Sequence, residues 1–170
     1  MFGNNVTFST ASTACENVRF GDNTVLGGLG MADGGGGNVQ MKHTVTGNDI
    51  VGAANIDASD STITGNKFRG AVTIGTTTAR ADDTVAGNRI EGALTVGVGC
   101  MVTGNIGNST TDITVSAGCT VIGNTFRNLL PVMGDPEPGG GKTPVLGNRI
   151  LGSRFGVAGP FVGDYLGNQS

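Results

Sequence analysis

The chain has 170 residues and a mass of 17.0 kDa, with 32 glycines and only 14% charged residues. Glycine disfavours helix interiors by roughly 1 kcal/mol relative to alanine, so this composition argues against a helical bundle. A hydrophobic content of 37% argues against simple disorder, and the net charge of −3 gives no electrostatic footprint for nucleic acid or an anionic membrane.

The first 41 residues are expected to form N-terminal rungs of the repeat described below. Gly3-Asn4-Asn5-Val6 fits that repeat, the segments that begin at Asn17 and Asn23 resemble strands, and Gly27–Gly37 is expected to be a loop. The N-terminus lacks the basic and apolar regions of a secretory signal, and no apolar run of about 18 residues is present. We therefore expect a protein made in the cytoplasm that does not enter a membrane.

A repeat of about 20 residues dominates the chain from residue 42 to 152. The pair Gly-Asn recurs at residues 47–48, 65–66, 87–88, 104–105, 123–124, 147–148 and 167–168. A period of this length is typical of solenoid proteins. Numbering each repeat from its glycine as position 0 aligns the surrounding residues in columns.

Three of these columns are apolar, and each lies in a short segment rich in Val, Ile and Thr, which favours strands. Position −2 holds Val45, Ile63, Val85, Val102, Val121 and Val145. Position +3 holds Ile50, Phe68, Ile90, Phe126 and Ile150, and position +9 holds Ile56, Ile74, Val96, Ile113 and Val132. The pattern predicts an all-β chain, a right-handed parallel β-helix of about eight rungs with three strands each.

The asparagine at position +1 is expected to form a ladder along one corner, each amide bonding the next. Its members are Asn48, Asn66, Asn88, Asn105, Asn124 and Asn148. The preceding glycine suits a turn with positive φ. The repeat that begins at Gly104 has Gly107 at position +3 and Ile106 one place early, so we expect a local irregularity there.

The outward columns support the same register. Stacking in this register places Asp49 beside Lys67 and Arg69 beside Glu91. Opposite charges on neighbouring strands stabilise by roughly 0.2–1 kcal/mol each.

Cys100 and Cys119 share position −4 in consecutive rungs, within reach of a disulfide. In reducing cytosol a pair of small residues that fill a stack is the favoured interpretation. The three cysteines lack the spacing of a zinc site or a disulfide framework. We expect no metal and no cofactor.

The last third of the chain contains all five prolines, and the segment 131–144 is expected to project as an inserted loop. Residues 153–170 are expected to form a cap or a contact between subunits. Outward positions become apolar toward the C-terminus at Met101, Ile122 and Leu146. These three residues are the candidate subunit contact of a homo-oligomer, most simply a trimer of parallel rods.

Three features of the sequence resemble catalytic or ligand-binding motifs. Asp60 and Asp82 share position −5, about 5 Å apart, which is near the carboxylate spacing of retaining glycosidases, but turn-capping explains them as well. His43 fits a solvated or capping residue. GGGKT resembles a phosphate-binding loop, yet Pro136 replaces the required glycine. No catalytic residue is predicted.

The Gly-Asn-x-Φ-x-Gly repeats at GNDIVG, GNKFRG, GNRIEG and GNRILG resemble the β-helix shafts of bacteriophage tailspikes and tailspike-like virion proteins. The resemblance covers residues 42–152. It implies a virion location and a non-enzymatic role, in which a trimer decorates the capsid surface and contacts the major capsid protein.

Two alternatives remain open. The first is a tail spike or receptor-binding protein that recognises or cleaves host surface polysaccharide. The second is an adhesin or an ice-binding solenoid, which the Thr-x-Thr segments at 44–46 and 62–64 favour.

Overall fold

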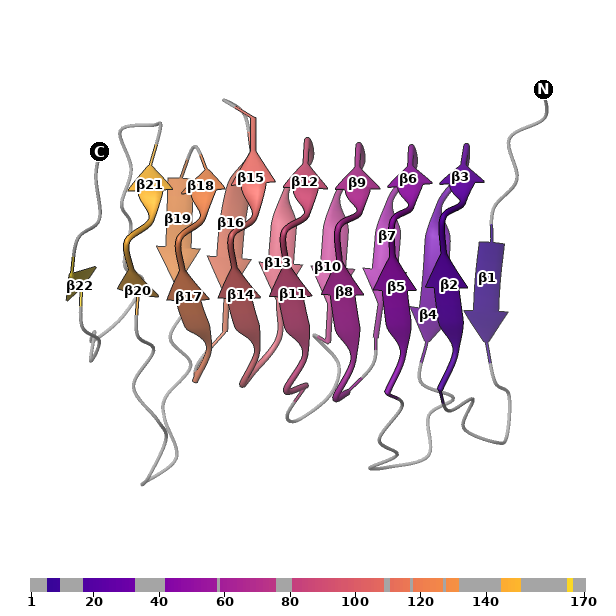
Figure 1. Ribbon diagram of the computed structural model, residues 1–170, viewed down its shortest axis with the longest axis horizontal. Coiled ribbons are helices and arrows are strands. Elements are labelled where there is room, and N and C mark those ends of the chain that lie inside the picture. The colour runs from indigo at the N-terminus through magenta and orange to yellow at the C-terminus, as the bar shows by residue number, and fades with distance from the viewer. Residues whose placement is uncertain are drawn as a thin grey trace.

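The computed structural model describes residues 6–9, 17–32, 42–57, 59–75, 81–108, 111–116, 118–126, 128–131, 145–150 and 165–166. Every secondary-structure element within these ranges is a short β-strand, and the described strands pair in parallel. The strands form three sheets that run the length of a rod (Figure 1). The all-β parallel β-helix predicted from the repeat is therefore confirmed.

Sheet A has seven strands, which lie behind the other two sheets in Figure 1. They are β1 (Val6–Ser9), β4 (Leu29–Ala32), β7 (Ala54–Ile56), β10 (Val72–Ile74), β13 (Leu94–Val96), β16 (Asp112–Val115) and β19 (Asn128–Pro131).

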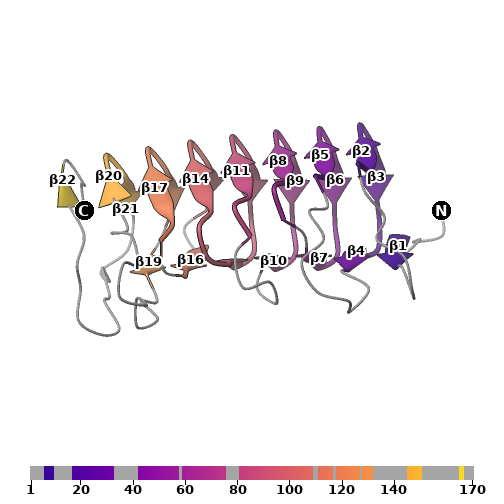
Figure 2. The ribbon, with the colours of Figure 1, turned by 90° about the horizontal axis from the view of Figure 1, so that it is seen from below.

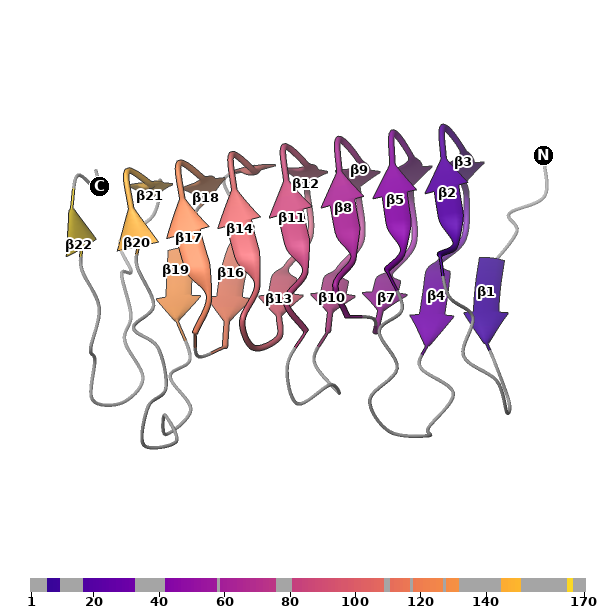
Figure 3. The same cartoon turned by 60° about the horizontal axis from the view of Figure 1, so that its bottom comes forward.

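Sheet B has eight strands and sheet C has seven, and the tight corner between them carries the Gly-Asn pairs (Figure 3). Sheet B contains β2 (Arg19–Gly21), β5 (Thr44–Thr46), β8 (Thr62–Thr64), β11 (Thr84–Ala86), β14 (Met101–Thr103), β17 (Thr120–Ile122), β20 (Val145–Leu146) and β22 (Tyr165–Leu166). Sheet C contains β3 (Thr24–Val25), β6 (Asp49–Ile50), β9 (Lys67–Phe68), β12 (Arg89–Ile90), β15 (Ile106–Gly107), β18 (Thr125–Phe126) and β21 (Arg149–Ile150).

Each turn of the rod runs through sheets B, C and A in that order. Strands of sheet B rise at the front and strands of sheet A descend behind, while the chain advances from right to left in Figure 1, so the coil is right-handed. Seen from below, sheet A lies opposite the corner that joins sheets B and C (Figure 2). About eight rungs were predicted. Among the described residues, sheet B has eight strands, and sheets A and C have seven each.

The interior is a continuous apolar core built from all three sheets. Sheets B and C contribute one inward residue per strand, and sheet A contributes two. Buried members include Val45, Val85, Ile50, Phe68, Ile90, Phe126, Ile56, Ile74, Leu94 and Val96. Removing such side chains from water stabilises the fold by roughly 1.5–3 kcal/mol each. The predicted columns at positions −2 and +3 are confirmed by the strand register.

The N-terminal predictions need two corrections. Val6 pairs with Leu29 in sheet A, whereas the predicted repeat would place it at position +3, in sheet C; Gly3, Asn4 and Asn5 lie outside the described residues. The expected loop Gly27–Gly37 contains β4, because Leu29 and Met31 turn inward and are 2% and 1% exposed. Residues 33–41 lie outside the described part of the chain, as does most of the predicted loop 131–144.

The irregular turn after Gly104 is present, but it lies at the corner between sheets C and A. Gly107 keeps the register with Ile90, whereas five residues then precede Ile113, against three between Ile90 and Leu94. Thr111 is buried in this longer corner. A Cβ on Gly107 would lie 2.6 Å from Thr111 and 2.7 Å from the Phe126 ring, so these two side chains fill its place.

The longer corner also corrects the column predicted at position +9. Ile113 pairs with Leu94, and it is Val115 that pairs with Val96. In the next turn Pro131, and not Val132, pairs with Val115.

The charged residues on sheet C form ion pairs that differ in part from those predicted. Asp49 does lie beside Lys67 in the register, but its ion pair is with Arg69, at 2.6 Å. Glu91 pairs with Lys67 at 3.6 Å and with Arg89 at 3.5 Å. These groups are substantially exposed, so each pair contributes at most about 1 kcal/mol.

Candidate functional site

The asparagine ladder runs along the corner between sheets B and C. The Asn66 amide nitrogen and its Nδ2 both donate to Asn88 Oδ1, at 2.9 and 3.0 Å. Asn66 Nδ2 also donates to the Val45 carbonyl of the preceding turn, at 2.8 Å. The same contacts repeat along all six predicted members, which are 0–2% exposed: Asn48, Asn66, Asn88, Asn105, Asn124 and Asn148. The predicted ladder is present.

Asn23 is a further member that the sequence interpretation missed. Its amide nitrogen and Nδ2 donate to Asn48 Oδ1 at 2.9 and 3.1 Å. Asp22 stands in the glycine position and adopts the same left-handed conformation, with φ of 56°. Aspartate tolerates this conformation better than most residues, so an Asp-Asn pair followed by strand residues was the available signal.

Glycine recurs in two columns of the rod, and it is required there for two different physical reasons. Gly65, Gly87, Gly104, Gly123 and Gly147 have φ of 58–64°, and a Cβ on any of them would meet nothing within 4 Å. Gly70, at the corner between sheets C and A, has no such φ, but its Cβ would lie 2.5 Å from the Gly52 carbonyl oxygen. The first column needs glycine for its backbone conformation, and the second needs it for close packing of consecutive turns.

A second polar column lies at position −4, where the chain passes from sheet A to sheet B. His43, Ser61, Asp83, Cys100 and Cys119 are all buried, with exposures of 0–4%. The side chains of His43, Ser61 and Asp83 each accept a hydrogen bond from the backbone amide at position −4 in the preceding turn. The donors, in order, are the amides of Val18 at 3.2 Å, His43 at 2.8 Å and Ser61 at 2.7 Å. The two thiols donate to backbone carbonyls, Cys100 to Val98 at 3.9 Å and Cys119 to Gly97 at 3.0 Å.

These contacts assign the second column a structural task. Ser61 Oγ accepts from the His43 backbone amide and donates to the Ser59 carbonyl at 3.3 Å. The His43 ring accepts from Val18 through Nδ1. The interpretation of His43 as a capping residue is confirmed, whereas a solvated position is wrong because the side chain is 4% exposed.

Burial shifts the pKa values of two members of this column. Desolvation lowers the pKa of His43 below its ordinary value of 6.5, because the charged ring loses water. Desolvation raises the pKa of Asp83 to about 7, and the nearby carboxylates of Asp60, Asp82 and Asp57 add to the effect. Asp83 Oδ2 has no hydrogen-bond partner among the described residues.

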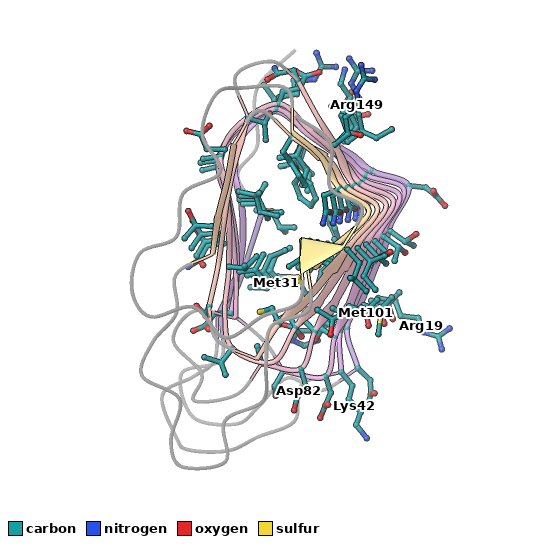
Figure 4. The ribbon with its side chains drawn as sticks, turned by 90° about the vertical axis from the view of Figure 1, so that its left-hand side faces the viewer. Arg19, Met31, Lys42, Asp82, Met101 and Arg149 are labelled. Carbon is teal, nitrogen blue, oxygen red and sulfur yellow. The ribbon has the colours of Figure 1, made fainter. Side chains whose placement is uncertain are left out.

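Asp60 and Asp82 stand next to this column at position −5. Both are exposed, and both have left-handed backbones with φ of 55° and 53°. Lys42, Gly99 and Gly118 occupy the same position and also have positive φ. Asp82 and Lys42 point away from the rod at its lower edge in Figure 4. The backbone conformation alone therefore accounts for the frequency of Asp and Gly at this position.

The outer face of sheet B changes in character along the rod. Its N-terminal strands present Thr44, Thr46, Thr62, Thr64 and Thr84. Its C-terminal strands present Met101 at 49% exposure, Ile122 at 38% and half-buried Leu146. Ile122 pairs directly with Leu146, and Met101 lies on the strand next to that of Ile122. The Met101 side chain lies on the outside of the rod in Figure 4. The structure thus places all three predicted contact residues on one face.

Ile106 is the most exposed large apolar side chain among the described residues, at 59%, but it lies on sheet C. Its outward direction follows from Gly107 taking the inward position in the same strand. We call the group Met101, Ile122 and Leu146 the sheet B patch.

The described residues contain no cluster of three or more His, Cys, Asp or Glu that could hold a metal ion. A helix able to span a bilayer is likewise absent from this part of the chain. Scans against protein-family models, curated proteins and solved structures find no match to this chain.

Proposed function

We propose that the chain is a non-enzymatic structural protein that assembles through the sheet B patch into a homo-oligomer, most simply a trimer of parallel rods. Its proposed place is the surface of a bacteriophage particle, as a tailspike-like capsid decoration that contacts the major capsid protein. The observation that carries the assembly is Met101, 49% exposed on a sheet face whose other outward residues are mainly threonine.

The chemistry-bearing side chains support a structural role. His43, Ser61, Asp83 and the two cysteines form hydrogen bonds with the backbone inside the rod and are at most 4% exposed. A nucleophile and its base need mutual contact and access to substrate. These side chains hold consecutive turns together instead.

The dimensions of sheet B suit a contact along the rod. Eight parallel strands at about 4.8 Å spacing give a face on the order of 35 Å long. A stable protein interface buries about 800 Å² on each partner, and its centre is enriched in apolar residues such as methionine. The sheet B patch supplies such a centre, and the threonines supply a polar rim.

Sedimentation equilibrium tests the assembly. The native chain is expected to sediment at three times 17.0 kDa. The double variant Met101→Lys with Ile122→Lys is expected to sediment as a monomer, because two buried charges without partners cost several kcal/mol. Thr62→Lys with Thr84→Lys, on the same face but in its polar half, is the matched control and is expected to remain assembled. A native chain that is monomeric at micromolar concentration would contradict the proposal.

Localisation on a particle tests the second half of the proposal. A reconstruction of a phage particle that carries this chain is expected to show it on the capsid shell, at three-fold or quasi-three-fold positions. Density for the chain only at the tail would instead favour the receptor-binding alternative.

A polysaccharide-binding or polysaccharide-cleaving spike is the second candidate. It rests on the exposed carboxylates of Asp60 and Asp82, which project from consecutive turns at one edge of the rod. Release of reducing ends from host capsular polysaccharide, abolished by Asp82→Asn but not by Asp112→Asn, would support it. Asp112 is a carboxylate of β16 in sheet A and serves as the control.

A further inference from the structure

Cys100 and Cys119 occupy equivalent places in consecutive turns. Met101 and Thr120, the residues that follow them, are partners in the register of β14 and β17. The Thr120 amide donates to the Cys100 carbonyl at 2.8 Å. Neighbouring parallel strands lie about 4.8 Å apart, and disulfides join Cα atoms about 4.4–6.8 Å apart. The backbone therefore already holds the two residues at a separation that a disulfide spans.

The two side chains also point to the same place. Both are buried, with exposures of 0%, and both are free thiols in this structure. Each thiol donates to a backbone carbonyl of the same corner, Cys100 Sγ to Val98 at 3.9 Å and Cys119 Sγ to Gly97 at 3.0 Å. No side chain from another turn lies between them, because β14 and β17 are adjacent in sheet B.

We propose that Cys100 and Cys119 form a covalent modification site, joined by a disulfide between consecutive turns when the chain equilibrates with a small-molecule disulfide such as oxidised glutathione. This site is separate from the sheet B patch, so it does not depend on the proposed assembly.

The surroundings of the two sulfurs assign the order of the exchange. The neighbouring Cys100 thiol lowers the pKa of Cys119, and the backbone amides of Cys100, Gly99 and Ser116 act in the same direction. The neighbouring Cys119 thiol and burial raise the pKa of Cys100. Cys119 is therefore the thiol that ionises first and attacks first.

The exchange then balances in two steps. The Cys119 thiolate attacks one sulfur of glutathione disulfide and releases a glutathione thiolate, which takes the proton of Cys100. The Cys100 thiolate attacks the Cys119 sulfur and releases the second glutathione. Two protein thiols are oxidised and one glutathione disulfide is reduced. Because both sulfurs are buried, a local opening of the corner between sheets A and B precedes the first attack.

Mass spectrometry of a Cys15→Ser variant tests the proposal, since Cys100 and Cys119 are then the only cysteines. The variant is equilibrated with equimolar reduced and oxidised glutathione in two ways, as the folded protein and during refolding from the reduced, unfolded chain. Free thiols are then alkylated. Trypsin cleaves after Arg89 and Arg127, with no Lys or Arg between, so one peptide carries both cysteines.

The expected product is a 90–127 peptide two hydrogens lighter and without alkyl groups, obtained by both routes and reversed by dithiothreitol. Closing a loop of about 20 residues is expected to raise the melting temperature by roughly 5–10 °C. Cys100→Ser and Cys119→Ser are the controls, because a serine hydroxyl can still donate to the carbonyl that each thiol bonds. Neither control is expected to show the temperature shift.

Three outcomes would overturn the proposal: a peptide alkylated at both cysteines by both routes, a stable glutathione adduct in place of the Cys100–Cys119 disulfide, or a disulfide between two chains. With dithiothreitol present no disulfide contributes to the sedimenting mass, so the test of the sheet B patch is independent of these outcomes and the two proposals fail separately.

Discussion

The two polar columns of the rod hold consecutive turns together in similar ways but with different residues. Along the corner between sheets B and C, asparagine stands at position +1 in every turn from Asn23 to Asn148. Along the corner between sheets A and B, five buried positions hold His, Ser, Asp and two Cys. In both columns, side chains accept hydrogen bonds from backbone amides of the turn before.

The number of bonds that each side chain makes explains this difference. Asn88 accepts two hydrogen bonds through Oδ1 and donates through Nδ2 to the Ile63 carbonyl and to Asn105. Only a carboxamide of this length does both. A side chain in the second column needs only to accept, which an imidazole, hydroxyl, carboxylate or thiol can do. A group of His, Ser, Asp and Cys in a solenoid is therefore not by itself a sign of catalysis.

The largest expected effect comes from breaking the asparagine ladder at its centre. Asn88→Leu removes the acceptor of the Asn66 backbone amide, one of the two bonds of Asn66 Nδ2, and the Nδ2 donor to the Ile63 carbonyl. We expect a loss of about 4 kcal/mol in the free energy of unfolding, measured by urea titration. Ser61→Ala, which removes one acceptor from the second column, is the matched variant and is expected to cost about 1–2 kcal/mol. Equal losses would contradict the distinction between the columns.

The second expected effect is a dependence of stability on pH that arises in the second column. The native state keeps the Asp83 proton up to pH about 7, whereas the unfolded chain releases it near the ordinary value of 3.8. The unfolded state therefore binds fewer protons in this window, and the free energy of unfolding falls as the pH rises through it, by up to about 4 kcal/mol.

His43 works in the opposite direction. The unfolded chain takes up a proton near pH 6.5 that the buried native ring resists, so stability falls as the pH drops below that value. The difference between the native chain and Asp83→Asn, measured by urea unfolding from pH 4 to pH 8, isolates the Asp83 contribution. The variant is expected to lose the decline toward neutral pH. A decline that persists in Asp83→Asn would show that another group causes it.

The smallest effects are expected at the turn residues beside the two columns. Gly87→Ala places a Cβ in open space at φ of 62°, so only the backbone conformation is penalised, by about 1–2 kcal/mol. Asp82→Gly removes such a penalty at φ of 53° but makes the unfolded chain more flexible, so a change below about 1 kcal/mol is expected. Thermal unfolding of both variants makes the comparison, and a larger loss at Asp82 than at Gly87 would contradict it.

The sequence predicted the columns in which the same kind of residue stands in most turns. These are the apolar columns that contain Val85 and Ile90 and the asparagine ladder that contains Asn88, and all three are present as expected. Asn23 was missed because Asp22 replaces glycine in that turn, and β4 was missed because it lies in a glycine-rich stretch that was interpreted as a loop. Ile113 was misplaced because a corner gained two residues, which shifts every later residue of that turn while the sheets remain in register.

The second column could not be derived from residue types. Its members share no side-chain chemistry beyond the capacity to accept a hydrogen bond, and the donor is a backbone amide that every residue except proline has. The burial of Asp83 also required the structure, because Asp60 and Asp82, at the preceding position, are exposed. The sheet B patch was predictable because alternation along a strand assigns each residue to one face.

Both columns give the rod a direction. The bonds from backbone amides to side-chain acceptors all point the same way, toward the turn nearer the C-terminus. The two columns therefore differ at the two ends of the rod. Two rods related by an end-to-end two-fold axis would bring identical ends of these columns together, whereas rods related by rotation about a shared long axis keep the columns parallel and the like ends level.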